Sequence, residues 1–291
     1  MTKLKEEIFD YFPCILKIPQ EIESKVQEIR VRLGQPITFK YLNKEFVTDI
    51  LADEKMILSL LENFTNNSVY AVQSEINSGF ITIKGGHRIG ISGTCIFENG
   101  KIKNIRYISS LNIRVAHEIK GCSEKLINAL YNNYFENTWI LSSPGSGKTT
   151  LLRDMIRYLS ILGNNISVVD ERSEIAAMYK GIPQNDLGPR TDVMNNCRKD
   201  IGIRMMIRSM APSIIATDEI GDNKDIDAIY EANFAGIKLL LTAHGDDLKD
   251  VPKKLLQNKL FKNIVILKNQ NKPGVVEKIY KLQEDKYVVN S

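Results

Sequence analysis

The chain has 291 residues, 43% of them hydrophobic and 25% charged, which is typical of a globular protein long enough for two domains. A net charge of +4 is too weak to indicate nucleic-acid binding without a clustered basic patch, and four isolated cysteines indicate neither a zinc site nor a disulfide scaffold. The charged N-terminus disfavours a signal peptide, and the longest apolar runs fall far short of the roughly 20 residues of a membrane span, so we expect a cytoplasmic protein.

The first part of the chain predicts a smaller α+β domain over residues 1–116. Helical spacing of apolar residues occurs at 3–12, 53–64 and 70–77. Between these segments lie short β-like runs, namely IRVRL (29–33), PITFKYL (36–42), GFITIK (79–84), HRIGISGTCIF (87–97) and ISSLNIRVA (108–116). Residues 117–137 then predict a connector that ends in a helix and leads into a second domain, residues 138–291.

The stretch SSPGSGKTT (142–150) predicts a phosphate-binding loop, because it stands between an apolar strand, TWIL (138–141), and an amphipathic helix. Gly145 and Gly147 allow successive backbone N–H groups to turn toward phosphate oxygens. Lys148 then places an ammonium on the β- and γ-phosphates, and Thr149 offers a hydroxyl to Mg²⁺. The expected nucleotide-binding residues are Pro144, Gly145, Ser146, Gly147, Lys148, Thr149 and Thr150, and Thr149 is also an expected metal ligand.

One residue departs from the pattern G-x-x-x-x-G-K-[ST], because Ser142 stands where the first glycine is usual. This position ends the strand and does not require a positive φ, so we expect a small residue to serve there. The alternative interpretation is a chance Gly-Ser linker. The amphipathic helix that follows at once disfavours it.

Beyond this loop, strands and helices alternate, which predicts an α/β domain whose central, mainly parallel sheet carries helices on both faces. Three apolar runs end in polar residues: NISVVDERSEIA (165–176) in Asp170 and Glu171, SIIATDEIGD (213–222) in Asp218 and Glu219, and IKLLLTAHGDD (237–247) in Thr242 and His244. Parallel sheets gather their ligand-binding residues at the carboxyl ends of the strands. We therefore expect these side chains beside the glycine-rich loop.

The roles expected of these residues follow from their chemistry. Asp218 is expected to hold a Mg²⁺-bound water, and Glu219 is expected to polarise the attacking water. The alternative is that both are ordinary acids at the end of a strand. His244 is expected to hydrogen-bond the γ-phosphate or the attacking water, against the simpler interpretation of a turn residue. The segment NDLGPRTDV (185–193) fits either a mobile loop over the site or a plain surface turn.

Five motifs, in this order, resemble the stage III sporulation protein AA family: SSPGSGKTT, VVDERSEIA (168–176), NDLGPRTDV, MIRSMAPSIIATDEIGD (206–222) and LLLTAHG (239–245). EIRVRLGQPI (28–37) and KGGHRIGISG (84–93) are similar to the same family, so the resemblance covers nearly the whole chain. That family looks like a cytoplasmic branch of the secretion ATPase superfamily of type II and type IV systems.

The resemblance implies a RecA-like phosphate-loop NTPase domain, hydrolysis of ATP with Mg²⁺, and a hexameric ring in which ATP lies between the nucleotide domain and neighbouring N-terminal domains. It also implies a role at the channel between mother cell and forespore during endospore formation, peripheral to the inner membrane of the mother cell and bound to membrane proteins of that channel.

By the same likeness, residues 168–174, 208–222 and 241–245 correspond to the superfamily's Asp box, Walker B region and His box. The chain departs from many secretion ATPases in two places. It reads Asp170-Glu171 where many read Glu-Asp, and Asp218-Glu219 where many read Gly-Glu. The catalytic base is therefore open between Glu219 and Glu171.

In a ring, an arginine from a neighbouring subunit can stabilise charge on the transferring phosphoryl group. Candidates for this role are Arg88, Arg114, Arg190, Arg204 and Arg208. We favour Arg88, because the glycines around it in GGHRIG permit close approach of another chain. The alternative is that each arginine only forms a surface ion pair.

Three other functions compete with ATP hydrolysis by a secretion-type enzyme. A ring-shaped nucleic-acid motor would need stacking aromatics beside clustered Lys and Arg, but Tyr41, Phe46, Tyr70 and Phe80 alternate with apolar neighbours as core residues do. A GTPase is suggested by D-x-x-G at 218–221, yet residues 223–226 break the N-K-x-D pattern. A scaffold that only binds ATP is disfavoured by the carboxylates at the strand ends. The sequence thus favours an Mg²⁺-dependent ATP hydrolase, with nucleic acid not expected as a partner.

Overall fold

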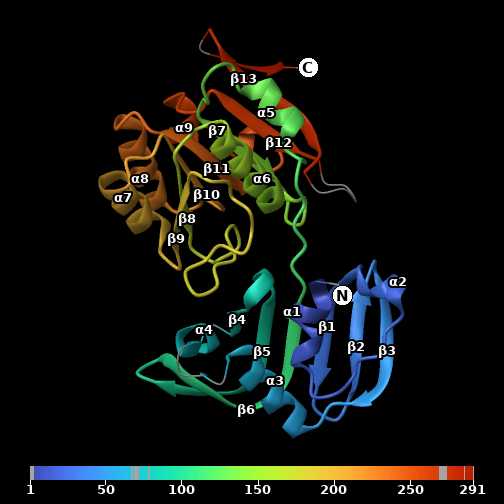
Figure 1. The fold of residues 1–291 in the computed structure, drawn as a ribbon. Helices are drawn as coiled ribbons and strands as arrows, with labels where there is room; N and C mark the ends of the chain where they lie inside the picture. The colour runs from blue at the N-terminus through green and yellow to red at the C-terminus, as the bar shows by residue number, and fades with distance from the viewer. Residues whose placement is uncertain are drawn as a thin grey trace. The chain divides into compact units, whose positions relative to one another are not determined.

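The computed structural model describes residues 3–66, 68, 72–77, 79–268, 274–284 and 286–290. Backbone contacts divide the chain into two compact units (Figure 1). Unit 1 is Met1–His117 with Tyr179–Gln184, and unit 2 is Glu118–Met178 with Asn185–Ser291. Most of the expected connector, from Glu118 on, thus falls within unit 2.

The described strands of unit 1 form one antiparallel sheet in the order β3-β2-β1-β6-β5-β4. Their bounds are β1 Val26–Arg32, β2 Pro36–Tyr41, β3 Lys44–Leu51, β4 Phe80–Thr82, β5 Arg88–Glu98 and β6 Lys101–Arg114. The helices are α1 Lys3–Glu7, α2 Gln20–Glu23, α3 Glu54–Phe64 and α4 Gln73–Asn77, with a short 3₁₀ turn at Phe9–Tyr11.

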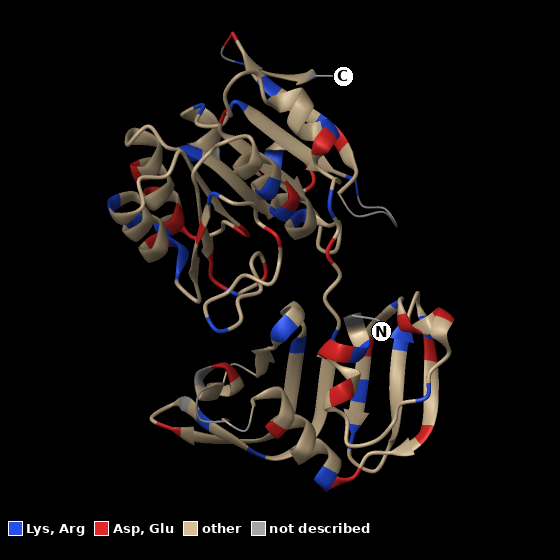
Figure 2. Cartoon of the chain, viewed as in Figure 1, with Lys and Arg blue, Asp and Glu red and all other residues tan. Residues whose placement is uncertain are grey.

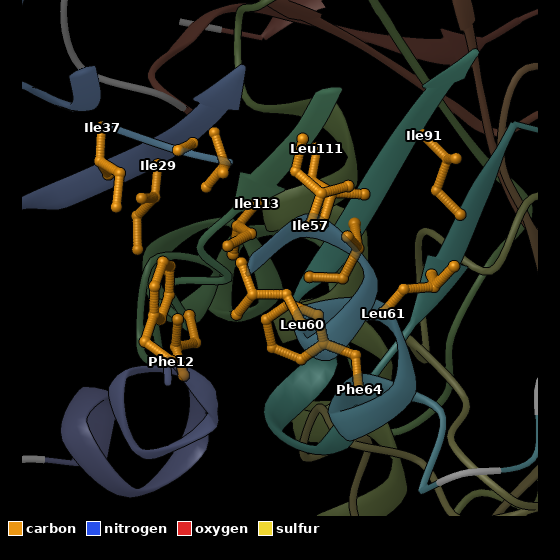
Figure 3. Packing of buried hydrophobic residues seen from close by; sticks show 14 of the residues in the cluster. Phe12, Ile29, Ile37, Ile57, Leu60, Leu61, Phe64, Ile91, Leu111 and Ile113 are labelled. Atoms are coloured by element: carbon orange, nitrogen blue, oxygen red, sulfur yellow. The ribbon is translucent and has the colours of Figure 1, made fainter. Parts of the chain in front are cut away.

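The core of unit 1 lies where α3 covers one face of this sheet. Asp53 begins the helix, since its side chain accepts a hydrogen bond from the N–H of Met56 at 2.7 Å. Figure 3 shows Ile57, Leu60 and Phe64 of α3 together with residues of the strands. Because α3 and the sheet bury apolar surface against each other, each stabilises the other.

Most elements expected in this part of the chain are present, with different bounds. The helix expected at 3–12 is α1 followed by the 3₁₀ turn, and the helix expected at 70–77 is α4, with residues 70 and 71 lying outside the described ranges. Strand β3 was not expected from the sequence.

Unit 2 contains a second sheet, in the order β14-β13-β12-β7-β11-β10-β8-β9. The strands from β12 to β9 run parallel, whereas β13 and β14 are antiparallel additions at one edge. The strand bounds are β7 Thr138–Ser142, β8 Ile166–Asp170, β9 Thr191–Asn195, β10 Ile214–Thr217, β11 Lys238–His244, β12 Asn263–Leu267, β13 Val276–Gln283 and β14 Lys286–Asn290.

Helices pack on both faces of this sheet, as the sequence predicts. The bounds are α5 Glu124–Leu130, α6 Lys148–Ile161, α7 Lys199–Ser209, α8 Asn223–Phe234 and α9 Lys253–Gln257. Apolar residues of α5 and α6 form one core with the sheet, and those of α7, α8 and α9 form the other. Strands β7, β8 and β10 are therefore buried along their whole length, which explains their continuous apolar runs.

All helices in the described ranges are too short or too polar to cross a lipid bilayer.

Because they are parallel, strands β7, β8, β10 and β11 end at the same edge of the sheet. The polar residues that follow them are thereby brought together.

Candidate functional site

The backbone between β7 and α6 forms a tight loop, residues 143–147, which we call the glycine loop. Gly145 and Gly147 adopt left-handed φ angles of 79° and 85°, a conformation that glycine accepts at little cost. Ser142 is the last residue of β7, is fully buried and has no positive φ. A serine therefore fits where the usual pattern has glycine, as expected.

Lys148 opens α6, and its ammonium group points back at the glycine loop. Its Nζ donates to the carbonyl oxygens of Ser142 at 2.9 Å and Ser143 at 3.3 Å, and to Nδ1 of His244 at 3.1 Å. Burial lowers the pKa of Lys148, and the charge of Glu219 opposes this shift. The lysine thus sits at the carboxyl end of β7, where three protein acceptors hold its ammonium group.

A pocket of about 370 Å³ opens around the glycine loop and the start of α6. Its lining residues are Pro144, Gly145, Gly147, Lys148, Thr149, Thr150, Glu174, Glu219 and His244. The pocket therefore brings together all but one of the expected nucleotide-binding residues. The exception is Ser146, which is buried and donates its hydroxyl to the carbonyl of Ser143 at 3.0 Å.

Asp218 and Glu219 follow directly after β10, but their environments differ. Asp218 is 2% exposed, and burial, reinforced by the charge of Asp170, raises its pKa to about 7. Glu219 has a left-handed φ of 43°, and its N–H donates to Oγ1 of Thr242 at 3.1 Å. Glu219 lines the pocket.

His244 connects the lysine to the glutamate. An ammonium group can only donate, so Nδ1 of His244 is the acceptor for Lys148 and the ring proton lies on Nε2. Nε2 is 3.4 Å from Oε1 of Glu219, whose other oxygen accepts from Arg172 at 2.9 Å. The three predicted residues therefore form one continuous polar chain across the pocket.

Glu171 lies elsewhere, although the sequence offered it as a second candidate base. Its carboxylate is 2.5 Å from the ammonium of the buried Lys199, and it does not line the pocket. Glu174, three residues further on, does line it. The sequence places Glu174 just beyond the strand that ends in Asp170 and Glu171 but assigns it no role, because it follows that strand within an irregular loop.

The arginines considered for a role in the reaction are dispersed. Arg88 lies in β5 of unit 1, with its guanidinium 4.2 Å from the centre of the Phe80 ring, and the described pocket-lining residues all belong to unit 2. Arg204 of α7 pairs with Glu231 of α8 at 2.9 Å. Figure 2 shows acidic and basic residues interspersed along these two helices, so they present no single-sign surface.

The segment 185–193 is packed on unit 2 and does not line the pocket. Leu187 is buried, and the N–H of Arg190 donates to Oγ of Ser160 at 2.7 Å. Ser160 stands near the end of α6, whereas the glycine loop precedes its start. Of the two interpretations left open by the sequence, the structure favours a packed connection over a loop that covers the site.

The residues present fit a magnesium–nucleotide complex. Thr149 lines the pocket with its hydroxyl, whereas Asp218 follows directly after β10 at the same edge of the sheet, is buried and does not line the pocket. Hydroxyl and carboxylate oxygens are both donors of the kind that Mg²⁺ prefers. Among the described residues, no group of three or more His, Cys, Asp or Glu side chains is placed to hold a metal by itself. An ion held by one or two protein groups together with phosphate oxygens and water is the arrangement that this donor set suits.

Comparisons with known proteins show which family and which fold the chain resembles. The chain matches the family described as sporulation stage III, protein AA, over residues 11–287. Stage III sporulation protein AA of Bacillus subtilis (strain 168) is 39% identical over 283 residues, which cover 92% of this chain and 90% of the relative.

Two solved structures share the fold. The ATPase DotB of Legionella pneumophila gives a TM-score of 0.58 at 15% identity, with 91% of this chain and 80% of DotB covered. The pilus retraction motor PilT, solved with bound ADP, gives a TM-score of 0.58 at 15% identity, with 86% of this chain and 78% of the PilT chain covered. These likenesses confirm the expected fold, a RecA-like domain with a parallel-rich sheet preceded by a smaller α+β domain.

Proposed function

We propose, because the chain belongs to the sporulation stage III, protein AA family, that it is a secretion-type ATPase that hydrolyses ATP with Mg²⁺ during endospore formation. One observation carries the chemical part of this proposal. The pocket around the glycine loop joins an ammonium, a hydroxyl, two glutamates and an imidazole at the carboxyl edge of a parallel sheet. The ADP bound to PilT, a protein of the same fold, supports an adenine nucleotide as the ligand.

In this proposal the chain's own groups divide the work. The N–H groups of the glycine loop and the ammonium of Lys148 hold the phosphates, which requires Lys148 to leave the carbonyls of Ser142 and Ser143. Thr149 and Asp218 would hold Mg²⁺, the latter through a water, and a bound ion would supply positive charge beside the phosphate oxygens.

Glu219 is the better candidate for orienting the attacking water. It lines the pocket and touches His244, whereas Glu171 is held by Lys199 outside the lining. His244, which bridges Lys148 and Glu219, is placed to respond when the γ-phosphate leaves. Glu174 is a further acid that could act on water or on the ion's water shell.

The test of this assignment compares two glutamine variants. We expect Glu219→Gln to bind ATP as the unchanged protein does and to lose at least about 100-fold in kcat, since the water loses its orienting carboxylate. Glu171→Gln, the matched control on the neighbouring strand end, should keep kcat within about 3-fold. The measurement is phosphate release from saturating ATP, with GTP as a second substrate. Normal turnover by Glu219→Gln would remove this residue from the mechanism.

The rest of the proposal concerns assembly. We propose a homo-oligomeric, hexameric ring in which Arg88 of one subunit acts on the nucleotide of its neighbour. Hydrolysis would drive the assembly or operation of the channel between mother cell and forespore, with the chain bound from the cytoplasm to membrane proteins of that channel. The family relationship supports this role.

A further inference from the structure

Glu174 reaches the pocket from a loop whose backbone is strained. Ser173, just before Glu174, has a φ of 55°, and Ala177, three residues after Glu174, has a φ of 49°. Left-handed conformations of this kind are strained at residues other than glycine and persist only when the surroundings enforce them. Some part of unit 2 must therefore hold the segment Glu174–Ala176 in place.

The N–H side of this segment is held by Asp170, the last residue of β8. Its carboxylate accepts hydrogen bonds from the N–H groups of Glu174 at 2.8 Å, Ile175 at 3.0 Å and Ala176 at 2.8 Å. Asp170 is fully buried, so these bonds replace the water that the carboxylate has lost. Asp170 is thereby committed to the loop backbone.

The carbonyl side is held by Arg153, which lies on α6 five residues after Lys148. Nη2 of Arg153 donates to the carbonyl of Glu174 at 2.9 Å, and Nε donates to that of Ile175 at 3.0 Å. A guanidinium presents two N–H donors in a fixed, planar arrangement that suits two successive carbonyl oxygens. A lysine ammonium cannot replace it, because it is a single charged group on a flexible side chain. Burial lowers the pKa of Arg153, and nearby acids, including Asp170 and Glu174, oppose the shift.

We infer that Arg153 is a positioning residue that fixes Glu174 relative to the glycine loop. Lys148, Thr149 and Arg153 belong to one helix, so the grip of Arg153 on the loop ties the Glu174 carboxylate to the frame that holds the phosphates. Without this grip, Asp170 alone of these two residues holds the strained loop, and the Glu174 carboxylate can leave its place in the pocket. The kinetic part of this inference rests on the proposed ATP hydrolysis.

The test uses Arg153→Lys, which keeps the charge and most of the stem but removes the fork. The control is Arg157→Lys, one turn further along α6, where the same fork binds Asp154 of the same helix at 3.0 and 2.9 Å. We expect Arg153→Lys to lower kcat roughly 10- to 100-fold while KM changes less than about 3-fold, because a displacement of about 1 Å suffices for such a loss. The kcat and KM of Arg157→Lys should stay within about 3-fold of those of the unchanged protein.

A double-mutant cycle separates positioning from a general structural effect. In a Glu174→Gln background, Arg153→Lys should change kcat by less than about 3-fold, because the group that it positions is already gone. An equal loss in both backgrounds would show that Arg153 acts through something other than Glu174 and would overturn the inference.

Hydrogen exchange without nucleotide gives a readout that does not depend on turnover. Arg153→Lys should speed amide exchange in residues 173–178 at least about 10-fold, and Arg157→Lys should not. Unchanged exchange in this segment would overturn the inference even if the protein is an active ATPase. If the unchanged protein fails to hydrolyse ATP, the proposed function fails, and the exchange result alone decides whether Arg153 holds the loop.

Discussion

At the scale of single residues, the acids that follow β8 and β10 differ in the groups that bind them. Glu171 is neutralised by Lys199, Asp170 is occupied by three backbone N–H groups, and Glu219 is held at the pocket by Arg172 and His244. Asp218 differs from these, because its burial outweighs the opposing charge of Lys199 and raises its pKa to about 7. A carboxyl group in this state favours a cation beside it.

The shifted pKa of Asp218 predicts a dependence of stability on pH. The folded chain binds the Asp218 proton up to about pH 7, whereas the unfolded chain releases it near the ordinary value of 3.8. The group's contribution to stability is therefore fully present below about pH 3.8 and is lost as the pH rises to about 7. Without metal or nucleotide, we expect Asp218→Asn to raise the free energy of unfolding at pH 8 by up to about 4 kcal/mol.

The measurement is urea denaturation in the presence of EDTA at pH 8 and at pH 5, followed by a signal from unit 2. The difference in free energy of unfolding between Asp218→Asn and the unchanged protein should be smaller at pH 5, because Asp218 keeps its proton in the folded state there. Equal stability of the two proteins at pH 8 would contradict the assigned burial of a charged Asp218.

At the scale of elements, close contacts set where helices meet the sheet. Gly202 of α7 packs directly on β8, since a Cβ atom built at this glycine would lie 2.6 Å from Cγ1 of Val169. Val169 is fully buried and its β-branched side chain is stiff. The contact lets α7 approach the strand that ends in Asp170, and α7 carries Lys199, the partner of Glu171.

Gly202→Ala should therefore destabilise unit 2. The clash costs about 1–3 kcal/mol and exceeds the gain of up to about 1 kcal/mol from the higher helix propensity of alanine. Gly221→Ala is the control, because a Cβ atom there meets nothing within 4 Å and the φ of Gly221 is not positive. In the same denaturation experiment, the free energy of unfolding of Gly221→Ala should stay within about 0.5 kcal/mol of that of the unchanged protein. A stabilised Gly202→Ala would show that α7 does not lie this close to β8.

The sequence predicts an element best where local signals agree. Helix α3 combines the Asp53 cap with a continuous apolar face, and β7 and β10 are buried throughout and mostly apolar, so all three were expected. Strand β3 was missed because it is an edge strand with mixed exposure, and its charged residues obscure the alternation. Within the site, the glycine loop, Glu219 and His244 follow from spacing. Glu174 does not, because its place depends on Asp170 and Arg153, which tertiary structure alone brings to the loop.

At the scale of the whole molecule, the pocket-lining residues described in unit 2 include no arginine. In the proposed ring, Arg88 of a neighbouring subunit supplies this charge, so complete sites need two different chains. Each of Arg88→Ala and Glu219→Gln should then be inactive alone. An oligomer purified through separate tags on the two variants should regain part of the activity, since some sites combine the intact Glu219 of one chain with the intact Arg88 of another.

Phosphate release by the mixed oligomer, compared with each variant at the same total concentration, measures this recovery. Oligomers that contain both variants and remain as inactive as either alone would exclude Arg88 as a residue that acts between subunits.

The central claim is that the pocket at the glycine loop binds and hydrolyses ATP, and Lys148 tests it most directly. Isothermal titration with Mg²⁺ and ATP, together with phosphate release at a matched oligomeric state, should show tight binding and turnover for the unchanged chain. For Lys148→Ala we expect binding weakened at least about 10-fold and turnover at background, because the ammonium that meets the phosphates is lost. Equal binding and equal turnover by the two proteins would contradict the claim.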